Sequence, residues 1–295
     1  MIKFLKKCAW FLVLLVLFNS IYIVLLICFS PGFKKVYDVC RFKNQNFQCI
    51  VLGNSMALDA VDAKYLSEKG ITTFNLAIAG NHVSTSFFML EEYLKHNKTP
   101  KFVLVGLSSA IGESYLNQVS FTNPEVEFFY HPSLFSNIKN PPLLNFQWLV
   151  VDFLKIIISK DHRNAKMILG QWQTAKVIPD ASTYKSNQKV NINYNNTNLL
   201  KIITLCKQHN MKLILCELSG SNSNQNSLPF ENKIQLKNGE YITIYNLNNH
   251  DVASKIINAK TDWLAPDHLN KYGGKKQTKL IETIIKKEMN NIFIP

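Results

Sequence analysis

The chain has 295 residues, of which 47% are hydrophobic, and its formal net charge is +13 at pH 7. This length suits one large globular domain with an accessory segment, and the apolar content excludes a largely disordered protein. The charge is compatible with an anionic membrane surface, an acidic polymer or nucleic acid. Because the sequence contains no helix-turn-helix, zinc-finger or RNA-binding signature, we expect no nucleic-acid partner.

The first 35 residues predict a membrane anchor. Three lysines precede an almost wholly apolar run from Cys8 to Phe29, about 22 residues, which is enough to cross a hydrocarbon core of roughly 30 Å. A cleaved signal peptide is the alternative, but its apolar core is usually shorter and no small-x-small cleavage site follows here. We therefore expect an uncleaved anchor at 1–35, followed by a polar connector at 36–46.

Charge alone leaves the orientation of this anchor open. Basic residues flank the apolar run on both sides, so the positive-inside rule is nearly balanced. Long domains cross a membrane largely regardless of such charges. We expect a single-pass protein of the cytoplasmic membrane whose main domain lies on the extracytoplasmic side.

The six cysteines follow no metal-binding pattern, and we expect neither a metal nor another cofactor. Cys40 and Cys49 are close enough in sequence to close a short loop in an oxidising compartment. Cys206 and Cys216 are expected to be buried free thiols.

From residue 47 onward, apolar runs of strand length alternate with helical patterns. The expected strands are 47–52, 72–78, 102–107, 211–218 and 241–247, and the expected helices are 56–69, 83–96, 198–210 and 271–290. Continuously apolar strands that alternate with helices predict a parallel sheet covered on both faces. The expected domain is therefore α/β and covers residues 47–295.

An insertion at about 108–193 interrupts this alternation. Its apolar stretch, 143–158, is too short and too interrupted by polar residues for a second membrane span, so we expect a buried helix. An interfacial or partner-binding helix is the alternative. Residues 221–238 are expected to be a mostly polar loop.

Ser55 is the candidate nucleophile. It closes the segment Gly53-Asn54-Ser55 at the end of the first strand, and sites in open parallel sheets form outside the carboxyl ends of the strands. Gly53 permits a tight turn, and the following helix offers N–H groups to an anion. The alternative is a simple helix cap, because serine is a favoured N-cap residue.

Gly80 and Asn81 follow the second strand and should therefore lie near Ser55. A glycine N–H and an asparagine amide are suitable donors to a developing oxyanion, although Gly-Asn is also an ordinary turn. His82 is a candidate base beside them, with a structural histidine as the alternative.

His268 is the stronger candidate base. It lies in the segment Pro266-Asp267-His268-Leu269-Asn270, just before Gly273-Gly274 and the closing helix. Nucleophile and base are commonly distant in sequence and adjacent in space. The remaining histidines are expected to be structural or exposed, and they are His96, His131, His162, His209 and His250.

Four short segments have the residues and order of a known pattern: Gly53-Asn54-Ser55, Asn75-Leu76-Ala77, Gly80 and His268-Leu269-Asn270-x-x-Gly273. They resemble the SGNH/GDSL hydrolase superfamily. The resemblance is strongest to its membrane-anchored bacterial branch, which includes the teichoic-acid D-alanyl transfer protein and alginate and peptidoglycan O-acetyltransferase-like proteins. It covers most of residues 47–107 and 195–285.

The resemblance implies a three-layer α/β/α, flavodoxin-like fold. It implies Ser55 as nucleophile and His268 as general base, with an oxyanion hole formed by the backbone N–H groups of Ser55, Gly80 and Asn81. It also implies a multi-spanning membrane-bound O-acyltransferase as a partner.

Two positions depart from the family pattern. The acid usually found three residues before the histidine is replaced by Ala265, with Asp267 adjacent and Asp262 six residues earlier. Either Asp267 orients the imidazole, or a backbone carbonyl holds it in a Ser-His dyad. The Asn-Asp of the third family block is also absent, so that oxyanion donor is missing or comes from Asn81 or Ser108.

Motifs and resemblance together predict a membrane-anchored serine O-acyltransferase or acylesterase. Its substrate would be a cell-envelope glycan such as exopolysaccharide, lipopolysaccharide, peptidoglycan or teichoic acid. A catalytically weak or inactive SGNH-like scaffold for a membrane-bound O-acyltransferase is the main alternative, and a lipid esterase facing the cytosol is a third.

Overall fold

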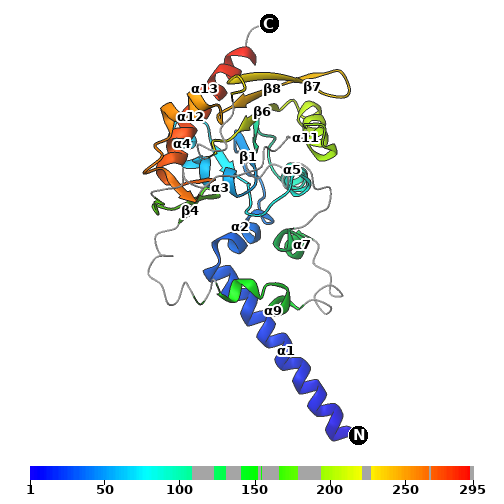
Figure 1. The fold of residues 1–295 in the computed structure, drawn as a ribbon. Coiled ribbons are helices and arrows are strands. Elements are labelled where there is room, and N and C mark those ends of the chain that lie inside the picture. The colour runs from blue at the N-terminus through cyan, green and yellow to red at the C-terminus, as the bar shows by residue number, and fades with distance from the viewer. Residues whose placement is uncertain are drawn as a thin grey trace. The chain divides into compact units, whose positions relative to one another are not determined.

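The computed structural model describes residues 1–107, 123–130, 141–151, 154, 166–178, 194–220, 227–265 and 267–292 (Figure 1). Contacts divide the chain into two compact units. Unit 1 comprises Met1–Arg41 and Pro124–Asn164, and unit 2 comprises Phe42–Asn123 and Ala165–Pro295.

Unit 2 contains a central six-stranded sheet. Its strands are β1 (Cys49–Gly53), β2 (Thr73–Asn75), β3 (Phe102–Leu107), β6 (Lys212–Glu217), β7 (Glu231–Gln235) and β8 (Tyr241–Asn246). The strand order is β2-β1-β3-β6-β8-β7, and every neighbouring pair is parallel except β7 and β8. Omitting the edge strand β7, this is the doubly wound order in which the chain reverses direction between β1 and β3.

Helices cover both faces of this sheet, which confirms the predicted α/β class. Alternate residues such as Val51 and Leu104 share a core with α3 (Ser55–Ala60), α4 (Ala63–Glu68) and α13 (Lys271–Ile292). The intervening residues, such as Leu52 and Val105, are also buried and point to the opposite face. There α5 (Val83–His96) contacts β1 and α11 (Thr197–Gln208) contacts β6.

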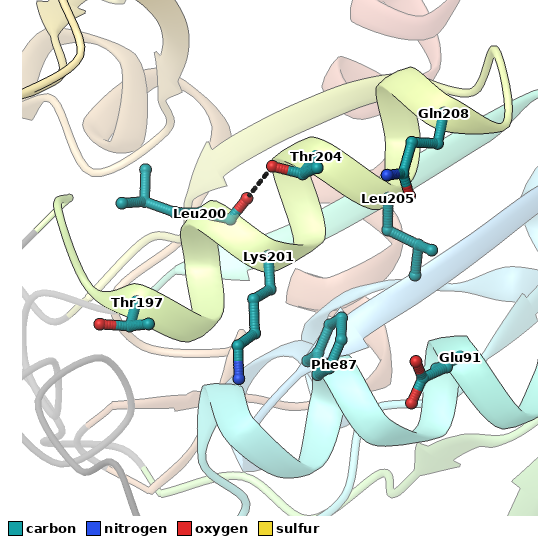
Figure 2. A pocket seen from close by; sticks show the side chains of 8 residues that line it. All are labelled: Phe87, Glu91, Thr197, Leu200, Lys201, Thr204, Leu205 and Gln208. Atoms are coloured by element: carbon teal, nitrogen blue, oxygen red, sulfur yellow. Dashed lines mark hydrogen bonds between the residues drawn. The ribbon is translucent and has the colours of Figure 1, made fainter.

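The outer sides of α5 and α11 enclose a shallow hollow of about 350 Å³ (Figure 2). Lys201 and Glu91 contribute charged groups to it, and the Lys201 ammonium lies 5.4 Å from the centroid of the Phe87 ring. The lining contains neither Ser55 nor His268. It therefore does not belong to the site that the sequence predicts.

The remaining elements of unit 2 are short. They are the antiparallel pair β4 (Lys166–Ile168) and β5 (Gln171–Gln173), helix α12 (His250–Ile256), and the antiparallel pair β9 (Trp263–Ala265) and β10 (His268–Leu269).

Unit 1 is helical in its described part, with α1 (Ile2–Phe29), α2 (Pro31–Val39), α7 (Pro124–Tyr130) and α9 (Pro142–Asn145). By length and composition, α1 is a candidate membrane span, a description that a signal sequence also meets. Its C-terminal third packs into a buried cluster formed by Tyr22, Leu26, Phe33 and Phe146.

Four expectations from the sequence are wrong in detail. The connector at 36–46 begins inside α2, because Val36 and Val39 are buried. The helix at 56–69 is broken at Asp62, whose carboxylate accepts a hydrogen bond from the Tyr65 N–H and starts α4. The polar loop at 221–238 contains β7.

The fourth correction concerns the apolar stretch 143–158, which is not a buried helix in its described part. Its exposed apolar side chains are Leu143, Leu144, Trp148, Val151 and Leu154. Most of the expected insertion at 108–193 lies outside the described residues. All six cysteines have free thiols, and Cys206 and Cys216 are buried as expected.

Candidate active site

The turn that presents Ser55 is formed by close backbone packing. β1 ends at Gly53, where an added Cβ would collide with the Cβ of Ala57 and lie 3.0 Å from the Gly106 carbonyl oxygen. Gly106 is the register partner of Gly53, and a Cβ there would lie 2.7 Å from the same Ala57 atom. Glycine in both strands therefore lets α3 pass close over the end of the sheet.

Asn54, and not Ser55, caps helix α3. The Asn54 carboxamide oxygen accepts a hydrogen bond of 3.1 Å from the N–H of Met56. Ser55 is the first residue of the helix, and its hydroxyl takes no part in this cap. The alternative role of Ser55 as a helix cap is therefore wrong.

Asn75, in the second motif of the resemblance, fixes the far end of α3. It is fully buried, and its amide nitrogen donates to the carbonyl oxygens of Ala57 (2.9 Å) and Val61 (3.2 Å). Its carboxamide oxygen accepts from the Ala77 N–H at 3.0 Å. The residue thus joins the loop after β2 to the helix that carries Ser55.

The structure brings Ser55 and His268 together. The imidazole Nε2 of His268 lies 2.8 Å from the Ser55 hydroxyl oxygen, although 213 positions separate the two residues in the chain. His268 belongs to β10, which pairs with β9 through an irregular register at this residue. Both side chains are half-buried.

Burial sets the charge state of His268. Desolvation lowers the pKa of its imidazole below the ordinary histidine value, and the charge of Asp267 opposes this effect to a smaller extent. The neutral ring therefore predominates at pH 7. With its proton on Nδ1, Nε2 accepts the hydrogen bond from the Ser55 hydroxyl.

Among the described residues, no acceptor forms a hydrogen bond with Nδ1 of His268. Ala265, at the position where the sequence resemblance leads us to expect an acid, lies directly opposite His268 in the β9–β10 pair. Asp267 acts on the imidazole through its charge and not through a hydrogen bond. The arrangement in the described part is therefore a Ser-His pair.

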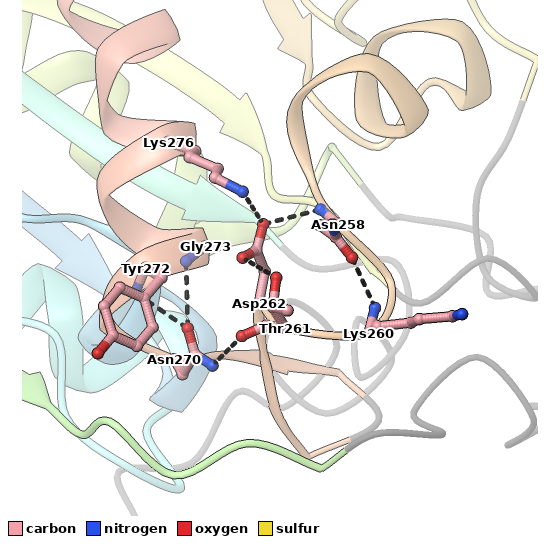
Figure 3. Close-up of polar contacts among 8 residues, drawn as sticks. All are labelled: Asn258, Lys260, Thr261, Asp262, Asn270, Tyr272, Gly273 and Lys276. Carbon is pink, nitrogen blue, oxygen red and sulfur yellow. Dashed lines mark hydrogen bonds and ion pairs between the residues drawn. The ribbon is translucent and has the colours of Figure 1, made fainter.

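Asp262 does not orient the imidazole, because its carboxylate is engaged elsewhere (Figure 3). One oxygen accepts hydrogen bonds of 2.7 Å from both the Asn258 N–H and the Lys276 ammonium. The other accepts from the Thr261 hydroxyl at 2.9 Å, and the residue is only 1% exposed. Asp262 instead ties the loop before His268 to helix α13.

Asn270 connects the same loop to the start of α13 (Figure 3). Its carboxamide oxygen accepts from the N–H groups of Tyr272 (2.9 Å) and Gly273 (3.2 Å), and its amide donates to the Thr261 carbonyl at 2.7 Å. A Cβ at Gly273 would lie 2.5 Å from the Asp262 carbonyl oxygen. These contacts explain why asparagine and glycine follow the histidine at this spacing.

The candidate oxyanion donors fall into two groups. Among the described residues, no acceptor takes a hydrogen bond from the backbone N–H of Ser55 or from that of Gly80. Gly80 has a φ of 66°, a conformation that favours glycine. All three N–H donors of Asn81 are engaged, with the Ile78 carbonyl (3.2 Å), the Gly53 carbonyl (3.3 Å) and the Ser86 hydroxyl (3.0 Å). Ser55 and Gly80 are therefore the available donors.

Comparisons with known proteins leave the family open. No protein-family model matches the chain, and no curated protein sequence matches it. Among solved structures, it is similar to a proposed acylhydrolase from Bacteroides fragilis NCTC 9343. The likeness covers 88% of this chain and 96% of that chain, at 9% sequence identity and a TM-score of 0.32. Similarity at this level decides neither the fold nor the activity.

The other described histidines lie at helix ends. His82 occupies the N-cap position of α5 without a side-chain cap, while His96, His209 and His250 lie at the ends of α5, α11 and α12, respectively. Several further residues singled out in the sequence lie outside the described residues, and they are Ser108, His131, His162 and Pro266. The cap role of Asn54 and the loop role of Asp262 were missed, although a favoured capping residue directly before Ser55 was a usable signal.

Proposed function

We propose that this protein is a serine acylesterase or O-acyltransferase in which Ser55 is the nucleophile and His268 the general base. The hydrogen bond of 2.8 Å between them is the observation that carries the proposal. A neutral, half-buried imidazole beside a serine at the carboxyl end of β1 is suited to accept the hydroxyl proton.

The first half of the reaction forms an acyl-enzyme. Nε2 of His268 takes the proton of the Ser55 hydroxyl while that oxygen bonds to the carbonyl carbon of an acyl ester. The carbonyl electron pair moves onto oxygen, where the N–H groups of Ser55 and Gly80 stabilise the negative charge. When the carbonyl re-forms, the bond to the leaving oxygen breaks, and that oxygen takes the proton from His268.

The second half transfers the acyl group to an acceptor. A sugar hydroxyl or water gives its proton to His268 and attacks the acyl carbon, and Ser55 leaves with that proton. A sugar acceptor yields a new ester, whereas water yields the free acid. Transfer requires an acceptor that competes with water for the acyl-enzyme.

The proposed substrate is a cell-envelope glycan, reached by a domain anchored through α1 on the extracytoplasmic side of the membrane. The net charge of +13 favours an anionic polymer or surface. The motif resemblance supports an acyl group delivered by a multi-spanning membrane-bound O-acyltransferase, with which this protein would work.

A serine-directed fluorophosphonate probe tests the nucleophile. We expect labelling of the purified protein that is lost in Ser55→Ala. Ser67→Ala is the matched control, because Ser67 is bonded within α4 and to the Thr73 N–H, and its loss should leave labelling intact. Labelling that persists in Ser55→Ala would remove the proposed nucleophile.

A non-catalytic scaffold is the second candidate. It is favoured by Ala265 and by the lack of an Nδ1 acceptor in the described part, since loss of the orienting acid costs about 10⁴ in rate in a serine protease. Glycan modification measured in cells that carry His268→Ala distinguishes the enzyme from the non-catalytic scaffold. Modification at the normal level would favour the scaffold.

A further inference from the structure

The described part of the stretch 142–154 exposes a large apolar surface. Leu144 is 63% exposed, Val151 is 54% exposed and Trp148 is 46% exposed. From Pro141 to Val151 the sequence contains no charged residue. Exposed apolar patches of this kind mark a surface that is covered by something other than water.

This stretch is fixed to the C-terminal third of α1, within unit 1. The Tyr22 hydroxyl donates to the Phe146 carbonyl at 2.7 Å, and the Leu143 N–H donates to the Asn19 carboxamide oxygen at 2.9 Å. Phe146 is fully buried beside Tyr22 and Leu26. Removal of α1 by signal cleavage would therefore remove half of this core.

The position of these contacts along α1 sets their depth in a membrane. Lys3, Lys6 and Lys7 mark one boundary, because charged side chains avoid hydrocarbon. From Cys8, residues 19 to 26 lie about 16 to 27 Å along the helix at 1.5 Å per residue, inside a hydrocarbon core of roughly 30 Å. A segment that contacts Asn19 and Tyr22 lies at the same depth.

The backbone at the start of α9 is suited to this environment. A helix N-terminus normally leaves several N–H groups without partners, which hydrocarbon does not tolerate. Here Pro141 and Pro142 have no N–H, and the N–H of Leu143 is bonded to Asn19. The N–H groups of Leu144 and Asn145 donate to the Pro141 carbonyl at 2.8 and 2.9 Å.

We propose that residues 142–151 enter the bilayer beside α1, with lipid acyl chains covering their exposed apolar face. The proposal rests on the anchor role of α1 in the proposed function. Helix α1, which contacts α9, exposes apolar side chains of its own, which include Phe18, Ile21 and Val24. The protein would then be held by one span and one shorter, partly inserted segment.

Tryptophan quenching by lipids brominated in their acyl chains tests this directly in the full-length protein, reconstituted in phosphatidylcholine vesicles. Trp148 reports on the segment and Trp10 on α1, where it is 68% exposed. Trp10→Phe isolates the Trp148 signal, Trp148→Phe isolates the Trp10 signal, and the double variant gives the background of Trp172 and Trp263.

We expect bromolipids to quench the fluorescence of Trp10→Phe, and we expect this quenching to be absent in the double variant. Leu144→Trp, placed in the double variant, should restore quenching by bromolipids. If Trp10 is quenched but Trp148 and the new tryptophan respond only to aqueous iodide, the inserted segment is refuted while the anchor stands; that face would then be open to a protein partner. If Trp10 is also unaffected by bromolipids, the anchor itself fails.

Discussion

The Ser55 turn and the loop that carries His268 meet at one hydrogen bond, yet they are built in different ways. The turn depends on backbone surfaces that approach closely, at Gly53 and Gly106, with a capping side chain at Asn54. The loop depends on a buried carboxylate, Asp262, and a buried amide, which hold it to α13 by directed polar contacts.

This difference has a consequence for substitutions. Steric packing fails as soon as one methyl group is added, because nearby backbone atoms have no room to move. A polar network can keep most of its hydrogen bonds when an amide replaces a carboxylate of the same shape, because few buried groups are then left unpaired. Substitutions in the two regions should therefore differ in size and kind.

The largest expected effect is the loss of the base itself. We expect His268→Ala to reduce kcat for an activated ester such as p-nitrophenyl acetate by up to about 10⁶-fold, the cost of losing the base of a serine protease triad. His209→Ala is the matched control, because His209 is exposed at the end of α11. Equal activity of the two variants would contradict the assigned role of His268.

A methyl group at the turn comes next. Gly53→Ala should lower the free energy of unfolding by about 1–3 kcal/mol through overpacking and reduce kcat about 100-fold by displacing Ser55. The control is Gly32→Ala, where no atom lies within 4 Å of the added methyl group. Thermal unfolding and ester hydrolysis measure both effects, and a Gly53→Ala protein that behaves like the control would disprove close packing at this turn.

The loop should respond more gradually. Asp262→Asn removes the charge that pairs with Lys276, which is partly exposed, so we expect a loss of about 1–2 kcal/mol and a fall in kcat of about tenfold. Glu240→Gln breaks the exposed pair with Lys207, which solvent screens, and should leave stability nearly unchanged. If Asp262→Asn leaves both stability and kcat unchanged, the network does not position His268.

The smallest expected effect is a shift in pH dependence. Activity should rise with pH as His268 loses its proton, with a midpoint below the usual histidine pKa of about 6.5, because burial disfavours the imidazolium. Asp267→Asn removes a charge that stabilises the imidazolium, so the midpoint should fall further. The pH profile of kcat/KM measures it, and a midpoint above 6.5 would show that burial does not control this group.

Much of unit 2 was predictable because its core strands are continuously apolar. The helix at 83–96 and the strand at 102–107 have the expected bounds. The edge strand β7 was missed because its residues, Glu231–Gln235, alternate between exposed and half-buried positions and lack an apolar run. The break at Asp62 was missed because a capping carboxylate inside a helical pattern is recognised only once its tertiary contacts form.

The candidate site divides in the same way. Ser55 and His268 were recognisable because short motifs and their order carry the signal. The contacts that position these two residues were not recognisable, because Asp262 meets Lys276 only after folding brings α13 beside the loop. The sequence favoured a buried helix over an interfacial one around Trp148 and Leu144, because an apolar run does not reveal whether protein or lipid covers it.

The most direct test of the Ser-His pair is peptide mass spectrometry of protein quenched in acid during reaction with p-nitrophenyl acetate. We predict an acetyl group on the Ser55 hydroxyl of the wild-type protein and its absence in His268→Ala. An acetyl group found on another residue, or Ser55 acetylated equally in both proteins, would contradict the proposed mechanism.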